Sequence, residues 1–170
     1  TPNQLPQFDY VLPSLRLLPI DFPDFNAIDA IDSENVLRLG LRNKLQTKRD
    51  GKVANLLNWD LYTDWRLDPS SDQTHFSDVY SDIVSWPWSW LRFESLTRYN
   101  PENAQLRMAF ESATLQPNNV WSWSFAYFYL RDYYGTTDPT AWGEGTDNFL
   151  STIFYRFDDN WGFRLTHRYD

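Results

Sequence analysis

The chain contains no cysteine among its 170 residues. This absence excludes a disulfide framework, a thiolate zinc site and a cysteine nucleophile. Histidine is nearly as scarce, because only His75 and His167 occur, and neither has metal-ligand spacing around it. No serine stands in a nucleophile elbow, and no glycine-rich loop could cradle a phosphate. We therefore expect no catalytic residue, no cofactor and no metal site, in a protein that is not an enzyme.

Basic residues are outnumbered by acidic ones. The chain has 15 Lys and Arg against 23 Asp and Glu, which gives a net charge of −8. This charge excludes a basic nucleic-acid-binding module, so we expect no nucleic-acid partner. Residues 1–34 hold six acidic residues, one base (Arg16) and five of the ten prolines. Because proline disfavours helices and central strands, we interpret 1–34 as a proline-rich, acidic, extended segment that is either a flexible tail or a packed plug or strap.

Long apolar runs are also missing. The longest one, Phe125–Leu130, is far shorter than the roughly 18–20 residues that a transmembrane helix needs. The first residues have neither the basic nor the apolar region of a signal peptide. Neither absence excludes a membrane protein, because the strands of a transmembrane barrel alternate between two faces and give no such run.

A period of two begins at residue 35 and indicates strands. Leu37, Leu39 and Leu41 alternate with Arg38 and Arg42. The Asp50-Gly51 pair then predicts a two-residue type I′ hairpin. Three later connections contain Asn-Pro-Glu-Asn, Gln-Pro-Asn-Asn and Asp-Asp-Asn, which are typical of turns, and the last five prolines fall between candidate strands. The whole pattern predicts eight strands, at 36–48, 53–66, 75–85, 90–99, 105–115, 121–133, 147–157 and 161–170.

The strand pattern favours a transmembrane barrel over a soluble sandwich. Several candidates reach 11 residues or more, whereas soluble strands average about 5–6 residues and a barrel strand crosses a membrane in about 9–11. A charge at the bilayer midplane costs roughly 2–4 kcal/mol, so the charged face should meet water. We predict lumen-facing charges at Arg42, Asp60, Asp64, Glu94, Arg107, Glu111 and Arg164. We predict lipid-facing or girdle positions at Leu37, Leu39, Leu41, Trp59, Leu61, Phe93, Phe110, Trp121, Trp123, Phe125 and Leu165.

The paired carboxylates of the charged face are candidates for a metal site or an acid pair. Asp60 and Asp64 share one strand, as do Asp78 and Asp82. Residues four apart on a strand lie about 13 Å apart, which is too far to share one ion. We therefore interpret these carboxylates as part of a hydrated wall.

Four runs resemble the barrel domain of a known family. These are Leu39–Gly51, Asn58–Trp65, Thr114–Trp121 and Tyr155–Gly162. They resemble the lipopolysaccharide-assembly outer-membrane proteins (LptD, or organic solvent tolerance, family), and the resemblance, to a divergent member, extends over about 35–170. The shared features are strands and turns, so no functional residue is carried over.

The resemblance implies a bacterial outer-membrane barrel that passes lipopolysaccharide to the outer leaflet. It also implies a plug lipoprotein and a periplasmic transport bridge as partners, besides the membrane lipid, the lipopolysaccharide and the rest of the same barrel. The family barrel has far more than eight strands. We therefore expect an all-β, antiparallel, up-and-down transmembrane β-barrel in which 35–170 form an incomplete segment of about eight strands.

Two alternatives remain open from the sequence. One is a complete small eight-stranded outer-membrane barrel that anchors or binds. The other is a soluble carbohydrate-binding β-sandwich, in which the tryptophans at 86–90 and 121–123 would stack on sugars. The two membrane readings require detergent for solubility, whereas the sandwich does not.

Overall fold

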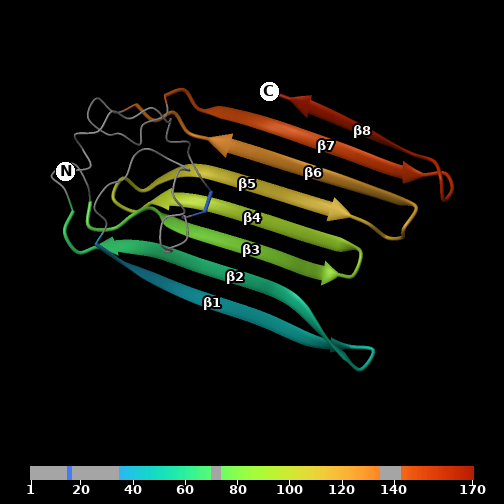
Figure 1. Cartoon of the computed structure of the whole chain (residues 1–170), viewed down its shortest axis with the longest axis horizontal. Coiled ribbons are helices and arrows are strands. Elements are labelled where there is room, and N and C mark those ends of the chain that lie inside the picture. The colour runs from blue at the N-terminus through green and yellow to red at the C-terminus, as the bar shows by residue number, and fades with distance from the viewer. Residues whose placement is uncertain (1–14, 17–34, 70–73, 135–142) are drawn as a thin grey trace.

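The computed structural model describes residues 15–16, 35–69, 74–134 and 143–170 (Figure 1). The described residues form one sheet of eight antiparallel strands in the order β1-β2-β3-β4-β5-β6-β7-β8. Each strand therefore pairs with its neighbours in sequence, which makes the fold all-β and up-and-down. The strands are β1 (Val36–Arg49), β2 (Lys52–Arg66), β3 (Val79–Trp88), β4 (Leu91–Asn100), β5 (Gln105–Leu115), β6 (Trp121–Leu130), β7 (Thr146–Arg156) and β8 (Gly162–Tyr169).

The eight predicted strands are confirmed in number and order, but β3 begins at Val79 rather than at 75, and β6 ends at Leu130 rather than at 133. A further correction concerns Pro87. The sequence placed this proline between strands, but it lies inside β3. The pairing with β4 shifts register between Ser85 and Trp88. A bulge tolerates proline because the ladder does not need its missing N–H there. The Pro87 carbonyl oxygen accepts a hydrogen bond from Arg49 Nη2.

The predicted hairpin at Asp50-Gly51 is confirmed. Arg49 pairs with Lys52, so the loop has two residues. Both loop residues are left-handed, with φ of 51° at Asp50 and 74° at Gly51. A type I′ turn needs positive φ at both positions, and its twist matches that of the flanking strands.

Three further turns are stabilised by the same kind of hydrogen bond between a side chain and the backbone. The side-chain Oδ1 of Asn100, Asn118 and Asp158 each accepts hydrogen bonds from the backbone N–H groups two and three residues later. Asx side chains stabilise turns in this way because they replace a backbone acceptor. These turns are the ones that the Asn- and Asp-rich connections predicted.

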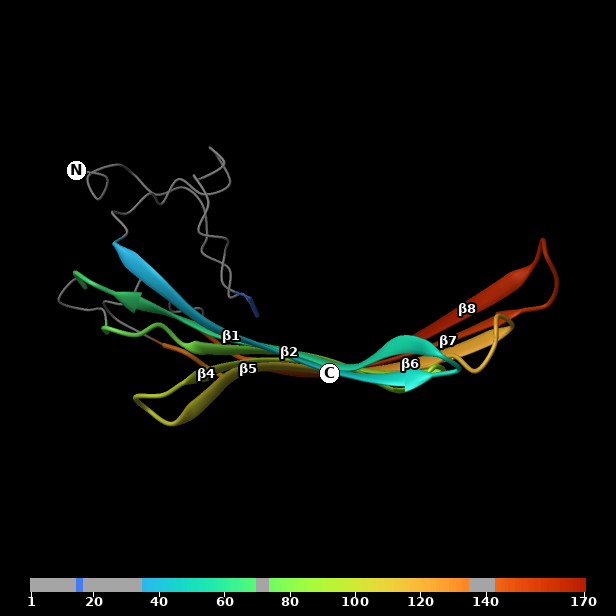
Figure 2. The same cartoon turned by 90° about the horizontal axis from the view of Figure 1, so that it is seen from below.

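The sheet is a single twisted layer, as Figure 2 shows. The buried apolar residues of the described chain are few, and they lie on the middle strands: Tyr80, Leu91, Leu96, Met108 and Ala109. None of the described side chains is both large and fully buried. Neither face therefore has a core of its own, and both must meet something outside the described residues.

The sheet does not close within the described residues. β1 pairs with β2 alone, and β8 pairs with β7 alone. Each outer strand leaves one row of backbone N–H and C=O groups unpaired in this sheet. A closed eight-stranded barrel is therefore not observed.

The expectations for the first part of the chain fall mostly outside the described residues. Of the acidic segment 1–34, only Leu15 and Arg16 are described, and residues 135–142 of the longest connection also lie outside. The short dark-blue piece at 15–16 lies to one side of the layer in Figure 2.

We predict that Gly145→Ala destabilises the β6–β7 connection. A Cβ atom at Gly145 would lie 2.1 Å from the Leu130 carbonyl oxygen, so the backbone would have to move. Overpacking of this kind costs about 1–3 kcal/mol. The measurement is the free energy of unfolding in urea for the full-length gene product in detergent micelles.

Gly40→Ala is the matched control. A Cβ atom there would make ordinary contacts, at 3.6 Å from the Tyr62 Cβ atom. Glycine weakens a strand by roughly 0.5–1 kcal/mol relative to alanine, so this change should be neutral or stabilising. Equal stability of both variants would contradict the packing at Gly145.

Candidate functional site: the polar face of the sheet

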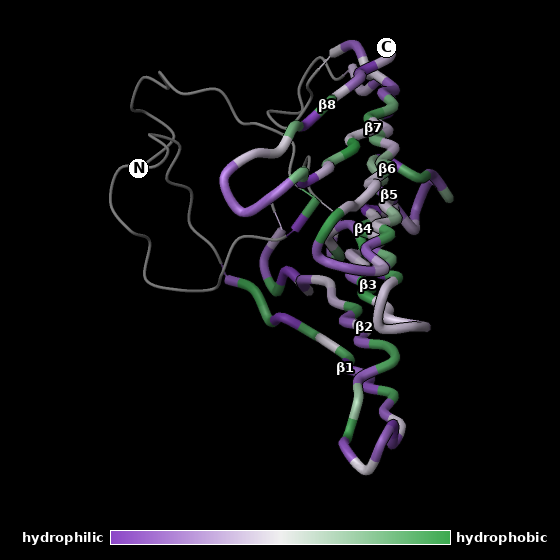
Figure 3. The backbone as a smooth tube through the Cα atoms, turned by 90° about the vertical axis from the view of Figure 1, so that its right-hand side faces the viewer, coloured by the Kyte–Doolittle hydropathy of each residue, from purple (hydrophilic) through white to green (hydrophobic). Residues whose placement is uncertain are grey.

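The register sorts the strand residues onto two faces, because directly paired residues point to the same side. Figure 3 shows the resulting alternation of hydrophilic and hydrophobic residues along the strands. The polar face carries Arg38, Arg42, Asp60, Tyr62, Asp64, Tyr80, Asp82, Glu94, Arg98, Phe110, Ser124, Phe128, Asn148, Leu150, Phe154, Arg164 and Arg168. The apolar face carries Leu37, Leu39, Leu41, Trp59, Leu61, Ile83, Phe93, Trp121, Trp123, Phe125, Phe149, Ile153, Phe163 and Leu165.

The apolar face is extensively exposed in the described chain. Leu41 and Leu165 are 66% and 59% exposed, and Phe93, Trp123 and Phe125 each exceed 40%. A continuous apolar surface of this extent marks contact with a membrane or a partner. The aromatic residues of this face also gather near strand ends, where Tyr155, Phe157 and Phe163 contact one another beside the β7–β8 turn.

The polar face begins with two ion pairs between β1 and β2. Arg38 donates two hydrogen bonds to Asp64, from Nε to Oδ1 at 2.7 Å and from Nη2 to Oδ2 at 2.9 Å. Asp64 is buried, at 8% exposure. Arg42 Nε donates to Asp60 Oδ1 at 2.9 Å, but the Arg42 side chain is 83% exposed. Removal of the partner of a buried charge lowers the stability of the fold much more than removal of the partner of an exposed charge.

The most buried charges form a cluster around Asp78, just before β3. Its carboxylate accepts a hydrogen bond from Arg98 Nε, and Arg107 Nε lies 3.5 Å from its other oxygen. The two guanidinium groups also lie over aromatic rings, Arg98 over Tyr80 at 5.5 Å and Arg107 over Tyr133 at 4.2 Å from the ring centroids. This cluster ties β3, β4 and β5 together at one end of the sheet.

Acidic side chains line the central strands. Asp60 on β2 stands directly opposite Asp82 on β3. Arg16 Nε donates to Asp82 Oδ2 at 2.8 Å, and Arg16 Nη2 lies 3.8 Å from Glu94 Oε1. The hydrogen bond with Asp82 raises the pKa of Arg16 above its usual value. Arg16 was not among the predicted site residues, and its only signal in the sequence is that it is the one base in 1–34.

The second half of the polar face, on β5 to β8, has a different chemistry. Its side chains are hydroxyls, aromatic or aliphatic groups and arginines, such as Thr152, Phe154 and Arg164. Arg168 donates to Asn148 Oδ1 through Nε at 3.0 Å and Nη2 at 2.8 Å. Arg164 makes no ion pair with any other described residue of the chain. Cationic and apolar groups therefore lie side by side on this half.

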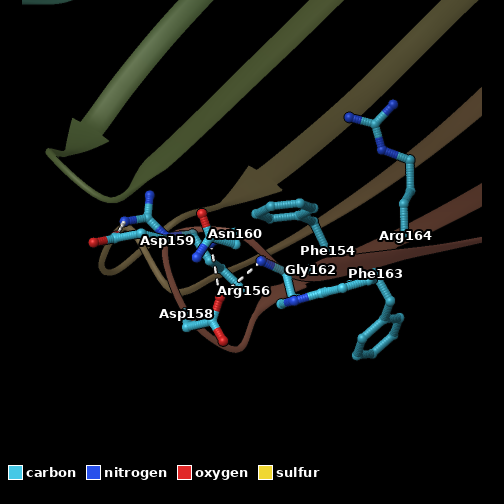
Figure 4. A pocket seen from close by; sticks show the side chains of 9 residues that line it. Phe154, Arg156, Asp158, Asp159, Asn160, Gly162, Phe163 and Arg164 are labelled. Carbon is cyan, nitrogen blue, oxygen red and sulfur yellow. Dashed lines mark hydrogen bonds and ion pairs between the residues drawn. The ribbon is translucent and has the colours of Figure 1, made fainter.

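A hollow lies at the β7–β8 turn (Figure 4). It has a volume of about 460 Å³ and is open to solvent. Figure 4 shows Phe154 and Arg164 pointing to the same side of the hairpin, with Phe163 on the other side. The walls of the hollow include Arg156, which donates to Asp159 Oδ1 at 2.7 Å. An aromatic ring beside a guanidinium group suits a ligand that is partly apolar and partly anionic.

The register places Glu111 and Phe110 on the opposite faces of the sheet from those predicted from the sequence. Glu111 stands opposite Ser95 and Tyr127 on the apolar face, where it accepts a hydrogen bond from Ser95 Oγ at 2.8 Å. Phe110 stands on the polar face instead. The cause is a bulge, because Arg98 pairs with Met108 and Tyr99 with Leu106, which leaves Arg107 as an extra residue. One extra residue reverses the alternation, so Arg107 and Glu111 end on opposite faces.

The carboxylates of the polar face were candidate metal ligands in the sequence. Among residues 15–16, 35–69, 74–134 and 143–170, no group of three metal-ligating side chains occurs. Asp64 and Asp78 are instead matched by arginines. The same described residues contain no helix with the length and hydropathy to span a membrane.

One comparison with known proteins finds a relationship. The family model described as "LptD: LPS transport system D" matches residues 22–161. The matched range contains β1 to β7 whole. No curated protein and no solved structure gives a significant match to the chain.

We predict that Asp78→Asn costs about 3–5 kcal/mol of unfolding free energy. The change removes the Asp78 carboxylate from Arg107, which is buried, and from Arg98, which is half-buried. Asp60→Asn removes the partner of the exposed Arg42 and should cost far less than Asp78→Asn, because solvent screens an exposed ion pair. Urea unfolding of both variants in micelles measures the difference, and equal losses would rule out the Asp78 cluster as the tighter ionic contact.

Proposed function

The chain belongs to the LPS transport system D (LptD) family, and from this premise we propose that its eight strands form part of the wall of an outer-membrane β-barrel. The family acts in lipopolysaccharide transport and assembly and is not an enzyme family. In our proposal the apolar face meets lipid, and the polar face meets the water-filled interior through which lipopolysaccharide passes. The described residues form one sheet rather than the two of a sandwich.

The observation that carries the proposal is the segregation of the two faces. Most of the exposed leucine, tryptophan and phenylalanine side chains of the strands occupy one face, with Leu150 as an exception, while the ion pairs occupy the other. Burial of apolar surface in lipid returns about 25 cal/mol per Å², whereas a charge at the midplane costs roughly 2–4 kcal/mol. The predicted lumen-facing charges Arg42, Asp60, Asp64, Glu94, Arg107 and Arg164 and the predicted lipid-facing leucines fit this orientation. Glu111 is the exception described above.

The open edges support a larger barrel. An unpaired backbone N–H or C=O group in hydrocarbon costs several kcal/mol, and for that reason only closed barrels and helices span membranes. The outer edges of β1 and β8 therefore need further strands, which we assign to the rest of the same barrel. A plug lipoprotein and a periplasmic transport bridge, the family's expected partners, complete the proposed assembly.

The mixed half of the polar face supports contact with lipopolysaccharide. This ligand carries anionic head groups and acyl chains, and arginines bind phosphate through charge-assisted hydrogen bonds. Arg164 and Arg168 lie on β8 beside Phe154 and Leu150, their cross-strand partners on β7. We propose these four side chains as the ligand-facing group of this chain.

Single-cysteine labelling tests the orientation. The 170 residues contain no cysteine. In the full-length gene product, with any cysteine outside these residues replaced by serine, Leu41→Cys, Arg42→Cys, Asp60→Cys and Leu61→Cys can each report alone. In liposomes, a membrane-impermeant thiol reagent should label positions 42 and 60 strongly and positions 41 and 61 weakly. Strong labelling of 41 and 61 with protection of 42 and 60 would overturn the membrane assignment.

We expect the double variant Arg164→Ala, Arg168→Ala to bind lipopolysaccharide about tenfold more weakly, because two charge-assisted contacts are lost. Titration of fluorescent lipopolysaccharide into the full-length gene product in micelles measures this. His167→Ala is the control, since His167 lies on the same strand opposite Ser151 on the apolar face. Equal losses in the double variant and the control would contradict the proposed contact.

A further inference from the structure

One contact joins distant parts of the chain across the polar face. Arg16 lies 66 residues before Asp82 in sequence, yet its Nε atom donates to Asp82 Oδ2 at 2.8 Å. Its Nη2 atom also lies 3.8 Å from Glu94 Oε1. Asp82 and Glu94 belong to neighbouring strands, β3 and β4, in the middle of the sheet. Arg16 therefore reaches two strands at once.

Asp60, Asp82 and Glu94 form the acidic centre of the polar face, and without Arg16 this centre has an excess of negative charge. Asp82 stands directly opposite Asp60, and like charges at such a position are destabilising. Asp60 has Arg42 as its base, whereas the one base that pairs with Asp82 within the described residues is Arg16. The two carboxylate oxygens of Glu94 lie near different arginines. Oε2 lies 2.9 Å from Arg92 Nη2, and Oε1 faces Arg16. Arg16 thus supplies the counter-charge that the neighbouring strands do not.

The sequence makes this contact selective. Residues 1–34 hold six acidic residues and a single base, Arg16. Carboxylates from that segment would be repelled by Asp60, Asp82 and Glu94. Arg16 is therefore the one charged side chain of 1–34 that the acidic centre can attract.

We propose that Leu15 and Arg16, called the strap below, dock reversibly on the polar face through the contacts of Arg16 with Asp82 and Glu94. The acidic centre is the docking surface, and a guanidinium group of the same chain is its occupant. The Arg16 side chain is 54% exposed, so the contact is open to solvent and sensitive to salt. If the polar face is the barrel interior, as proposed above, the anchored strap lies within it and its release exposes Asp82 and Glu94.

The test measures the mobility of the strap beside its anchor. A nitroxide label on Leu15→Cys reports motion by electron paramagnetic resonance, in the full-length gene product in micelles with any cysteine outside these 170 residues replaced by serine. We expect Arg16→Glu to reduce the immobile fraction about fivefold, because an exposed ion pair is lost and repulsion replaces it. We expect the charge swap Arg16→Glu, Asp82→Lys to restore the immobile fraction. Raising the salt concentration should loosen the strap in the parent protein and leave Arg16→Glu unchanged.

Lys48→Glu is the matched control. It makes the same charge change on an exposed residue of β1 near the hairpin turn, away from Asp82 and Glu94. The control should leave the label immobile. Unchanged mobility in Arg16→Glu, or equal release in Lys48→Glu, would overturn the proposal. Release on dilution alone would also overturn it, by assigning the contact to a second copy of the chain.

The result of the strap experiment does not depend on whether the proposed function is correct. Arg16 lies outside every strand, so Arg16→Glu tests the strap without altering the sheet. The spectrum reports docking on the polar face whether that face meets a barrel lumen or bulk water. Failure of the strap therefore leaves the labelling pattern of β1 and β2 intact, and a reversed labelling pattern leaves the strap measurement valid.

Discussion

The register in which neighbouring strands pair holds this sheet in its fold and sorts its side chains onto two faces. This sheet has no large, fully buried side chain among its described residues, so no core holds it together from one side. The backbone ladder and the separation of the two faces do this instead. Leu41 stands opposite Leu61, and Arg42 stands opposite Asp60. A slip of one residue would move every leucine to the charged face and every charge to the apolar face. The separation of apolar and charged residues onto the two faces therefore strongly favours this one register.

Bulges change that pattern at a few positions, and two of them bring an arginine side chain to its partner. The extra residue at Arg107 brings this guanidinium group to Asp78, beside Arg98, and it turns Glu111 to the other face. The bulge at Ser85–Trp88 accommodates Pro87 and places its carbonyl oxygen on Arg49. A bulge adds local twist and redirects side chains. The buried ionic cluster thus exists because one strand departs from strict alternation.

The polar face combines two chemistries that suit a family acting on lipopolysaccharide. Strands β1 to β4 carry acids matched by arginines, which gives a hydrated surface with little unpaired charge. Strands β5 to β8 place Arg164 and Arg168 among hydroxyl and aromatic groups. The first half holds neighbouring strands together, and the second half offers cations beside apolar surface. The same face can therefore serve structure at one side and ligand contact at the other.

Features that depend on neighbouring residues along the chain could be predicted from the amino-acid sequence. The eight strands, the Asp50-Gly51 hairpin and the three Asx-capped turns follow from local periodicity and turn chemistry, and the family resemblance rests on the same strands and turns. A period of two also fixes which residues of one strand share a side. It cannot reveal bulges or contacts between distant residues, because these depend on how strands align with one another. The three-dimensional fold was therefore needed to show which side Glu111 takes, which arginines surround Asp78, and that Arg16 pairs with Asp82 across 66 residues.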